Sequence, residues 1–201
     1  MLGRRSVAVA GLALALSACA DSSEPPRAAV PAAPTLTADG RIIVRGQGLT
    51  YAIRPPQGWS ARSVRGADRS TKSMVTVADI SPPGGVPAVI SGQMRTKTSE
   101  INSIDSWIER VTKTRRATDH DFTLWRAGPV PVAGARPSAM LVLENSEPPE
   151  GEGQPVDHEA VVLIEEPGAI AEIFLTTKTR ELLDQYLSTL RVVAASYGPA
   201  M

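Results

Sequence analysis

The sequence predicts an α+β domain in which helices flank a mainly antiparallel sheet. From residue 41 onward, short apolar runs alternate with turns rich in proline and glycine, a pattern typical of strands. Two other segments place apolar residues three and four positions apart, the period of a helix with one buried face. The order is several strands, a helix, four strands and a final helix, which favours an antiparallel sheet over repeated βαβ units.

Nine strands are predicted, with breaks at sequences such as Pro55-Pro56-Gln57-Gly58 and Pro82-Pro83-Gly84-Gly85. The segments 160–164 and 169–175, joined by Glu166-Pro167-Gly168, predict a hairpin near the centre of the sheet. The expected strand ranges are 41–44, 49–54, 60–64, 74–80, 87–94, 122–129, 138–144, 158–165 and 170–176.

Two amphipathic helices complete the expected domain. In the first, Asn102 with Asp105 three residues later predicts a capping box. The second is expected to begin after its cap, Thr179, to end near Arg191, and to pack on the sheet. The apolar positions are Ile101, Ile104, Trp107, Ile108 and Val111 in the first helix, and Leu182, Leu183, Tyr186, Leu187 and Leu190 in the second.

Three short motifs resemble those of PsbP/Mog1-like domains. Residues 49–59 (LTYAIRPPQGW) are similar to the opening strand, proline and Gly-Trp of that family. Residues 132–137 (VAGARP) resemble the start of a middle strand, and residues 186–191 (YLSTLR) resemble the closing helix. The resemblance spans about 41–193 and implies an α/β/α sandwich. LpqN-like and DcrB-like lipoproteins share this plan, and it implies a binding, scaffold or accessory role without a catalytic set.

The N-terminus has the form of a lipoprotein signal peptide. A positively charged start with Arg4-Arg5 precedes an apolar run at 7–16, which is shorter than the roughly 20 residues of a membrane span. Leu16-Ser17-Ala18-Cys19 then resembles the lipobox of bacterial lipoproteins, in which the cysteine is acylated and becomes the first mature residue. An ordinary secretory signal leaves Cys19 unexplained, and the surroundings of Arg4-Arg5 match twin-arginine export weakly.

Cys19 is the only cysteine, so it can form no disulfide within the chain. We therefore expect a signal peptide at 1–18, a lipidated Pro/Ala-rich tether at 19–40, one domain at 41–195 and a C-terminal tail at 196–201. The expected location is the bacterial cell envelope, with the domain outside the cytoplasm. Which membrane holds the anchor stays open.

Charge is unevenly distributed although the net charge is zero. Residues 41–118 contain 13 Lys+Arg and 5 Asp+Glu, and residues 119–201 contain 5 and 13, so the two halves carry about +8 and −8. Either the halves neutralise each other in the fold, or a basic face meets anionic headgroups or an acidic envelope polymer. Few aromatic residues accompany the basic ones, which argues against nucleic-acid binding. The basic candidates are Arg62, Arg65, Arg69, Lys72, Lys113, Arg115 and Arg116.

Candidate chemistry is sparse. His120 and His158 each lie between two acidic residues. Imidazole and carboxylate groups together can bind a divalent metal ion or form a His-carboxylate pair. Alternatively, these triplets begin strands, so that neighbouring side chains point to opposite faces. No serine or cysteine hydrolase motif is present, and neither a cofactor nor a metal site is expected. The tryptophan side chains either pack in the core or line a ligand groove. Trp107 is expected in the core, and either role is possible for Trp59 and Trp125.

These observations predict a non-catalytic binding, scaffold or accessory module. It is expected to be anchored in the membrane through acylated Cys19 and to engage an envelope protein, a cell-wall component or a lipid. The alternative is an envelope hydrolase or metal-dependent enzyme with a site near His120 or His158.

Overall fold

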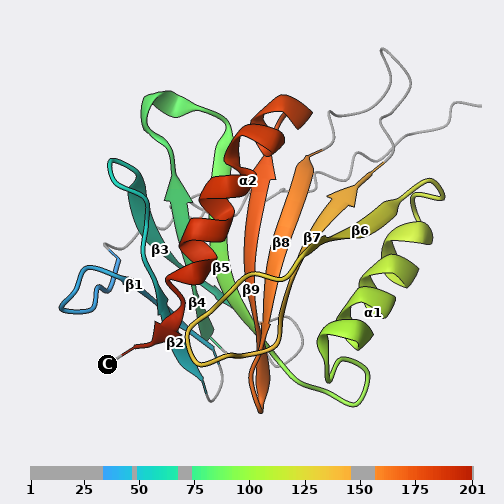
Figure 1. Cartoon of the computed structure of the whole chain (residues 1–201), viewed down its shortest axis with the longest axis horizontal. Helices are drawn as coiled ribbons and strands as arrows, with labels where there is room; N and C mark the ends of the chain where they lie inside the picture. Colours follow the sequence, from blue (N-terminus) through green and yellow to red (C-terminus); the bar gives the residue numbers. More distant parts are fainter. Residues whose placement is uncertain (1–33, 47–48, 68–73, 146–156, 201) are drawn as a thin grey trace, which may run out of the picture. The chain divides into compact units, whose positions relative to one another are not determined.

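The computed structural model describes residues 34–46, 49–67, 74–145 and 157–200. This part of the chain is an α/β/α sandwich, in which an antiparallel sheet lies between two helices (Figure 1). The predicted α+β class is therefore confirmed. The strands are β1 (Ile42–Arg45), β2 (Thr50–Ile53), β3 (Ser60–Ala67), β4 (Met74–Ser81), β5 (Ala88–Thr96), β6 (Thr123–Gly128), β7 (Ser138–Glu144), β8 (His158–Glu165), β9 (Ala169–Thr177) and β10 (Gly198–Pro199).

The helices are α1 (Ile104–Arg116) and α2 (Arg180–Ala195), with a short 3₁₀ helix η1 (Pro83–Gly85) between β4 and β5. Neither α-helix in the described residues is long and apolar enough to cross a membrane. Each of the nine predicted strands coincides with an observed strand to within about three residues. The sequence analysis missed β10 and η1, which are too short to show a periodic pattern.

Seven strands form the main part of the sheet, in the order β3-β4-β5-β9-β8-β7-β6. Three more strands, in the order β10-β2-β1, join it where β1 pairs with β4 at Arg45 and Thr76. All the pairings are antiparallel. Gly92 on β5 lets β1 and β2 approach closely, because a Cβ there would lie 3.0 Å from Ile53 and 3.1 Å from the Tyr51 hydroxyl. That hydroxyl also donates to the Gln93 carbonyl at 2.9 Å.

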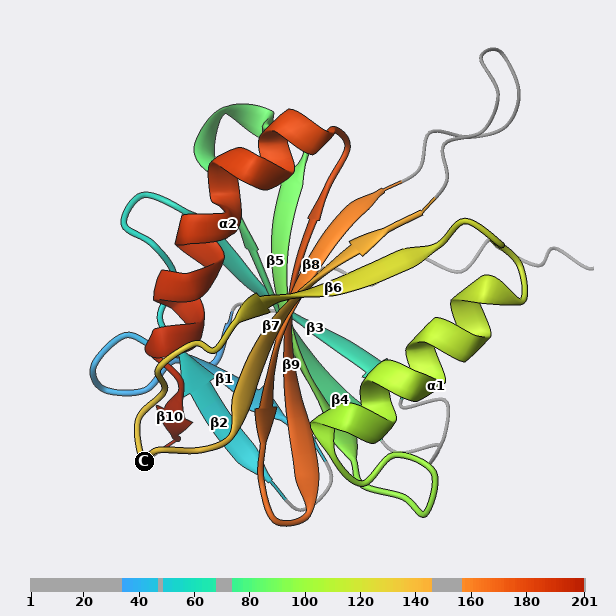
Figure 2. The ribbon, with the colours of Figure 1, turned by 45° about the vertical axis from the view of Figure 1, so that its right-hand side comes forward.

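The predicted hairpin is formed by β8 and β9, whose register pairs Val162 with Ile173 in the interior of the sheet. Its strands are apolar on both faces because both faces are covered. In β8, Ala160, Val162 and Ile164 belong to the cluster beneath α2, and Val161 and Leu163 belong to the cluster beneath α1. Figure 2 shows the two helices on opposite sides of the sheet. Burial of each valine, leucine or isoleucine side chain among them contributes roughly 1.5–3 kcal/mol as an upper estimate.

Thr179 caps α2 as predicted, because its side chain accepts a hydrogen bond from the Leu182 amide. The helix runs four residues beyond the predicted end at Arg191. Val193 and Ala194 extend the buried face, and they lie in the same cluster as Leu183 and Leu190. Apolar residues at helical spacing therefore set the true end of α2.

The predicted cap of α1 is wrong by one residue. Ser103, rather than Asn102, is the N-cap, and it forms a reciprocal capping box with Ser106. The Ser103 hydroxyl accepts from the Ser106 amide at 3.2 Å, and the Ser103 amide donates to the Ser106 hydroxyl at 2.9 Å. Asp105 lies in the first turn, where its negative carboxylate interacts favourably with the positive end of the helix dipole.

The folded unit extends beyond 41–195 at both ends. Leu36 pairs with Ile42, so residues assigned to the tether form a short hairpin. Tyr197, assigned to the tail, is 3% exposed and belongs to the core, and Gly198 pairs with Ala52. The tail prediction missed this packing because the partners of Tyr197 are distant in the sequence.

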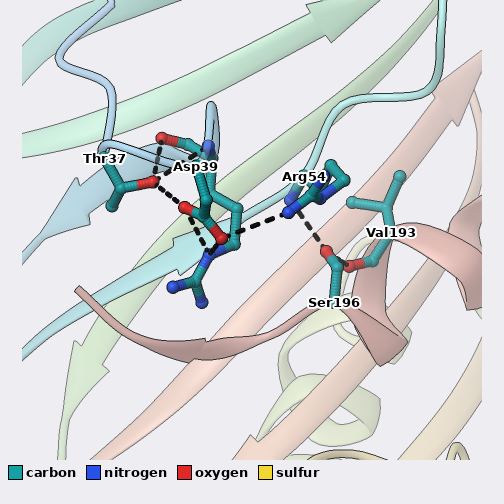
Figure 3. Close-up of polar contacts among 6 residues, drawn as sticks. Thr37, Asp39, Arg54, Val193 and Ser196 are labelled. Carbon is teal, nitrogen blue, oxygen red and sulfur yellow. Dashed lines mark hydrogen bonds and ion pairs between the residues drawn. The ribbon is translucent and has the colours of Figure 1, made fainter. Parts of the chain in front are cut away.

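A polar network joins the N-terminal hairpin to the end of α2 (Figure 3). The Asp39 carboxylate accepts hydrogen bonds from Thr37, from Arg41 at 2.9 Å and from Arg54 at 3.1 Å. The Arg54 amide in turn donates to the Ser196 hydroxyl at 2.7 Å. The hydrogen bond from Thr37 is the largest cause that lowers the pKa of Asp39 to about 2, and the two arginines lower it further.

Candidate binding cleft

The loop between β6 and β7, residues 129–137, borders two adjoining hollows on the described surface. Its sequence PVPVAGARP contains three prolines, which restrict the backbone. Gly134 (φ 82°) and Ala135 (φ 50°) follow each other in the left-handed region. Residues 132–137, whose sequence resembles the start of a middle strand, form the turn before β7, and β7 spans Ser138–Glu144 as predicted.

Side chains at the base of the loop hold this turn in place. Ser138 donates from its hydroxyl to the Val130 carbonyl, and Arg136 donates to the Ala133 carbonyl at 2.6 Å. A left-handed conformation costs a residue with a Cβ roughly 1–2 kcal/mol. Ala135 therefore keeps it only because contacts on both sides fix the backbone.

Arg136 also connects the loop to the core through Glu166 and Tyr197. Its guanidinium forms an ion pair with Glu166 and lies 5.7 Å from the centre of the Tyr197 ring. The Tyr197 hydroxyl donates to Glu166 at 2.6 Å, and its ring packs on Tyr51 with 4.9 Å between the centroids. Burial, followed by the hydrogen bond to Glu166, raises the pKa of the Tyr197 phenol, so this donor stays protonated near neutral pH.

The first hollow, of about 480 Å³, is charged but internally neutralised. The Lys97 ammonium lies 2.9 Å from Glu165, which also accepts from the Ile104 amide at the start of α1. The hydrogen bond from Lys97 is the main cause that lowers the pKa of Glu165. The lining residues are Lys97, Gly134, Ala135, Arg136, Pro137, Glu165, Glu166 and Pro167.

The second hollow, of about 470 Å³, shares Ala135, Arg136 and Pro137 with the first and has a mainly apolar lining. It is lined by Pro129, Val130, Pro131, Val132, Ala135, Arg136, Pro137 and Ser138. Three prolines and two valines supply most of this wall. Because Arg136 is held by Glu166 and Ala133, the one charged residue of the loop is already partnered.

The two carboxylates of this cleft, Glu165 and Glu166, are held by ion pairs and hydrogen bonds. A catalytic acid needs a carboxyl pKa raised toward the working pH. Glu165 shows the opposite shift, and Glu166 accepts from both Arg136 and Tyr197. Both carboxylates therefore fix the geometry of the cleft.

The two predicted histidine sites lie in different elements. His120 is exposed in the turn after α1, and His158 begins β8. Strand alternation places His158 on the α2 side, whereas Glu159 reaches Arg115 of α1 at 2.8 Å. Within the described ranges, no group of three or more His, Cys, Asp or Glu side chains is arranged to hold a metal ion.

The pKa of the Glu159 carboxyl is raised above its ordinary value. Burial is the first cause, and the Arg115 guanidinium opposes it. A raised carboxyl pKa is a feature of catalytic acids, but ion pairs of structural importance also produce shifts. Glu159 lies on the α1 face and does not line either hollow.

Of the predicted basic residues, Arg62 lies on β3, and Lys113, Arg115 and Arg116 lie at the end of α1. Arg62 pairs with Asp79 at 3.1 Å, and Arg116 donates to the Phe122 carbonyl at 3.2 Å. Lys113 lies in the last turn of α1. Arg69, Lys72 and the side chain of Arg65 lie outside the described residues.

Several ion pairs join the basic half of the sequence to the acidic half. The antiparallel pairing of β5 with β9 and the packing of α1 bring opposite charges together. These contacts favour mutual neutralisation over a basic face. The pairs are Arg95–Glu172, Lys97–Glu165 and Arg115–Glu159.

Trp107 is buried as predicted, and its indole N–H donates to the buried Glu172 carboxylate at 2.8 Å. Trp59 packs edge-on against Tyr186, with 5.2 Å between the ring centroids. Trp125 is 38% exposed beneath the guanidinium of Arg180, which lies 5.5 Å from the ring centre. None of the three lines either hollow.

The sequence analysis did not identify Arg136 or Tyr197 as site residues. The prolines of 129–137 and the Glu166-Pro167 turn were available signals, but they indicate loops and not which loops meet. Cys19, the predicted lipidation site, lies outside the described residues. Comparison of the chain with protein-family models and with curated proteins finds no match.

Proposed function

We propose that this chain is an exported lipoprotein, anchored through acylated Cys19, whose domain is a non-catalytic binding or accessory module of the cell envelope. Its partner is an envelope protein or a cell-wall component. The observation that carries the proposal is the cleft beside the 129–137 loop, where a fixed apolar wall adjoins charges that neutralise each other. A site of this kind offers contact area and shape without an activated acid, base or nucleophile.

The N-terminal sequence supports the anchor. Pro34, the first described residue, lies 15 positions after Cys19. At no more than about 3.6 Å per residue, that segment reaches at most ~54 Å. The acylated cysteine supplies the membrane attachment. Each buried methylene contributes about 0.8 kcal/mol, and two or more acyl chains anchor a protein stably in the membrane.

The alternative, an envelope hydrolase or metal-dependent enzyme near His120 or His158, has one observation in its favour, the raised pKa of Glu159. Against it, Glu159 is held by Arg115, and the two histidine triplets are not gathered into one cluster of the described residues. Zinc titration followed by calorimetry separates the two. Heat that saturates at one equivalent supports the alternative, and no heat removes its metal-dependent form.

Metabolic labelling with an alkyne-bearing palmitate tests the anchor. We expect label on the wild-type protein in the membrane fraction and none on Cys19→Ser. Mass spectrometry should then place the modification on an N-terminal peptide that begins with Cys19. Unlabelled wild-type protein, or a mature N-terminus elsewhere, would overturn the lipoprotein assignment.

A further inference from the structure

We propose that α1 is a hinged strap. Its first turn, residues 104–107, is the fixed end. Residues 108–116, called the strap below, open locally from β7 and β8 while the sheet stays folded, and Arg115 is the side chain that holds them closed. This motion is independent of the proposed binding function.

α1 lies along β8 and runs in the opposite direction. At the start of α1, the Ile104 amide donates to Glu165 at the end of β8, at 3.3 Å. Near the end of α1, the Arg115 guanidinium donates to Glu159 near the start of β8, at 2.8 Å. From 104 to 115 the helix rises about 17 Å, and from 159 to 165 the strand extends about 20 Å. The two contacts therefore lie at opposite ends of the same strand.

The first turn of α1 is held by burial and by a buried carboxylate. Ile104 and Trp107 are the buried residues of this helix. The Trp107 indole N–H donates to the fully buried Glu172 at 2.8 Å, and Ser103 caps the helix. Moving this turn would expose the indole and remove a donor from a buried carboxylate, which is costly. The first turn therefore serves as the pivot.

The strap has weaker contact with the sheet. Every residue from Ile108 to Arg116 is half-buried or exposed, although Ile108 and Val111 pack on the cluster beneath α1. In α2, by contrast, buried residues continue from Leu183 to Ala194. A segment with few buried apolar side chains opens at a lower free energy than the rest of a domain. The second half of α1 is therefore easier to open than the second half of α2.

Arg115 joins the strap to two strands. Its Nη2 atom donates to Glu159 on β8 at 2.8 Å, and its Nη1 atom donates to Asn145, directly after β7, at 3.4 Å. The neighbouring Arg116 instead donates to the Phe122 carbonyl, in the turn that follows α1. Arg115 is therefore the side chain that fastens the strap to the sheet.

This fastening is weak enough to break. The side chain of Arg115 is 42% exposed, so solvent screens its ion pair with Glu159. Burial is the main cause that raises the pKa of Glu159, and the Arg115 guanidinium offsets it only in part. Keeping this carboxylate ionised beneath the helix therefore lowers the stability of the closed form. Once detached, residues 108–116 are too few to stay helical in water, where about 12–15 residues are needed, so opening unwinds them.

Opening uncovers an apolar strip of β7 and β8. Leu143 pairs with Glu159 in the sheet, and Leu141 pairs with Val161 two positions farther along. Leu141, Leu143 and Val161 are buried in the cluster beneath α1. The strap therefore controls the access of solvent to this part of the core.

Amide hydrogen exchange measured by nuclear magnetic resonance tests the strap. The sample is the ¹⁵N-labelled full chain in detergent micelles at pH 7. We expect the amides of 108–116 to exchange through one common opening, at least about tenfold faster than Val162 and Ile173 of the β8–β9 hairpin. The Trp107 indole N–H should stay protected, because it remains bound to Glu172. Low concentrations of urea should barely change the strap rates, since local opening exposes little surface.

Two substitutions on the same helix localise the effect. Arg115→Gln should accelerate exchange of the strap at least about threefold and leave the Trp107 indole and Val162 unchanged. Arg110→Gln is the matched control, because Arg110 lies 3.6 Å from the exposed Glu100, which precedes the helix. It should leave the strap rates unchanged. Arg115→Lys keeps the charge without the fork and should give an intermediate rate, so it carries the same test if Arg115→Gln does not fold.

Three results would overturn the proposal. The first is a set of rates that rises gradually toward Arg116, as in ordinary fraying of a helix end, with no effect of Arg115→Gln. The second is equal acceleration by Arg115→Gln and Arg110→Gln. The third is a common rate for the strap and Val162, which would mean that α1 opens only when the whole domain unfolds. None of these results bears on the proposed function, which the palmitate and zinc experiments test separately.

Discussion

The hydroxyl of Tyr197 donates a 2.6 Å hydrogen bond to the Glu166 carboxylate, which is also the ion-pair partner of Arg136. Tyr197 and Glu166 are 31 residues apart in the sequence. This contact connects the segment after α2 to the β8–β9 turn and, through Arg136, to the 129–137 loop. The shape of the cleft therefore depends on a residue near the end of the chain.

Tyr197→Phe should destabilise the protein by about 1–3 kcal/mol, because it leaves the buried Glu166 without one of its donors. Urea denaturation followed by circular dichroism measures the change. Tyr186→Phe is the matched control, since it keeps the ring contact with Trp59. Equal effects of the two substitutions would show that the Tyr197 hydrogen bond contributes nothing specific.

Ser63→Ala should stabilise the protein by about 1 kcal/mol. Of the buried side-chain oxygens and nitrogens in the described residues, only the Ser63 hydroxyl has no hydrogen-bond partner, and burial of such a group is costly. Ser91→Ala should have the opposite sign, because its hydroxyl donates to Asp79 at 2.8 Å. A clear loss of thermal stability in Ser63→Ala would mean that the hydroxyl has a partner in solution.

Gly92→Ala should destabilise the fold by roughly 1–3 kcal/mol, the usual cost of overpacking. The added methyl group would lie 3.0–3.2 Å from side-chain atoms of Ile53, Tyr51 and Val44, all of which belong to the buried core. Gly168→Ala meets no atom within 4 Å and is the control. If chemical denaturation gives the same midpoint for both variants, the close approach of β1 and β2 to β5 is incorrect.

The pKa of Asp39 predicts an acid-dependent contribution to stability. Its pKa is about 2 in the folded chain against an ordinary 3.8, so the ionised form is favoured by folding. The contribution is present above pH 3.8 and is lost as the pH falls toward 2. Thr37→Val should raise the Asp39 pKa toward 3.8, because Thr37 supplies the largest lowering effect.

Carboxyl ¹³C titration measures this pKa directly. Asp39→Asn should also flatten the stability profile between pH 4 and pH 2. An Asp39 pKa near 3.8 in the wild-type protein would contradict the network shown in Figure 3.

Local patterns predicted the elements well where the relevant contact lies within a few residues. Thr179 accepts a hydrogen bond from the Leu182 amide, three positions away, and it was correctly predicted as the cap of α2. The β8–β9 hairpin was evident because a short turn joins two apolar runs. The cap of α1 was misplaced because Asn102 and Ser103 are both suitable residues, and only the reciprocal bond with Ser106 decides between them.

The cleft could not be predicted from the sequence, because contacts between residues that are distant in the sequence form it. Nothing near Arg136 in the sequence indicates that it will meet Glu166, and nothing near Tyr197 distinguishes it from a residue of a polar tail. Glu172 is a similar case. It interrupts an apolar strand, yet it is fully buried because Trp107, Gln93 and Arg95 all donate to it.

Site-specific photocrosslinking in intact membranes tests the central claim, that an anchored module binds an envelope protein or a cell-wall component at the cleft beside the 129–137 loop. A photoreactive amino acid is placed at Pro131 or, as the control, at Val192, in the acylated protein. We predict one discrete adduct with such a partner from position 131, suppressed when Arg136→Ala loosens the loop, and no such adduct from position 192. Identical adducts from both positions, or lipid adducts alone from position 131, would contradict the account.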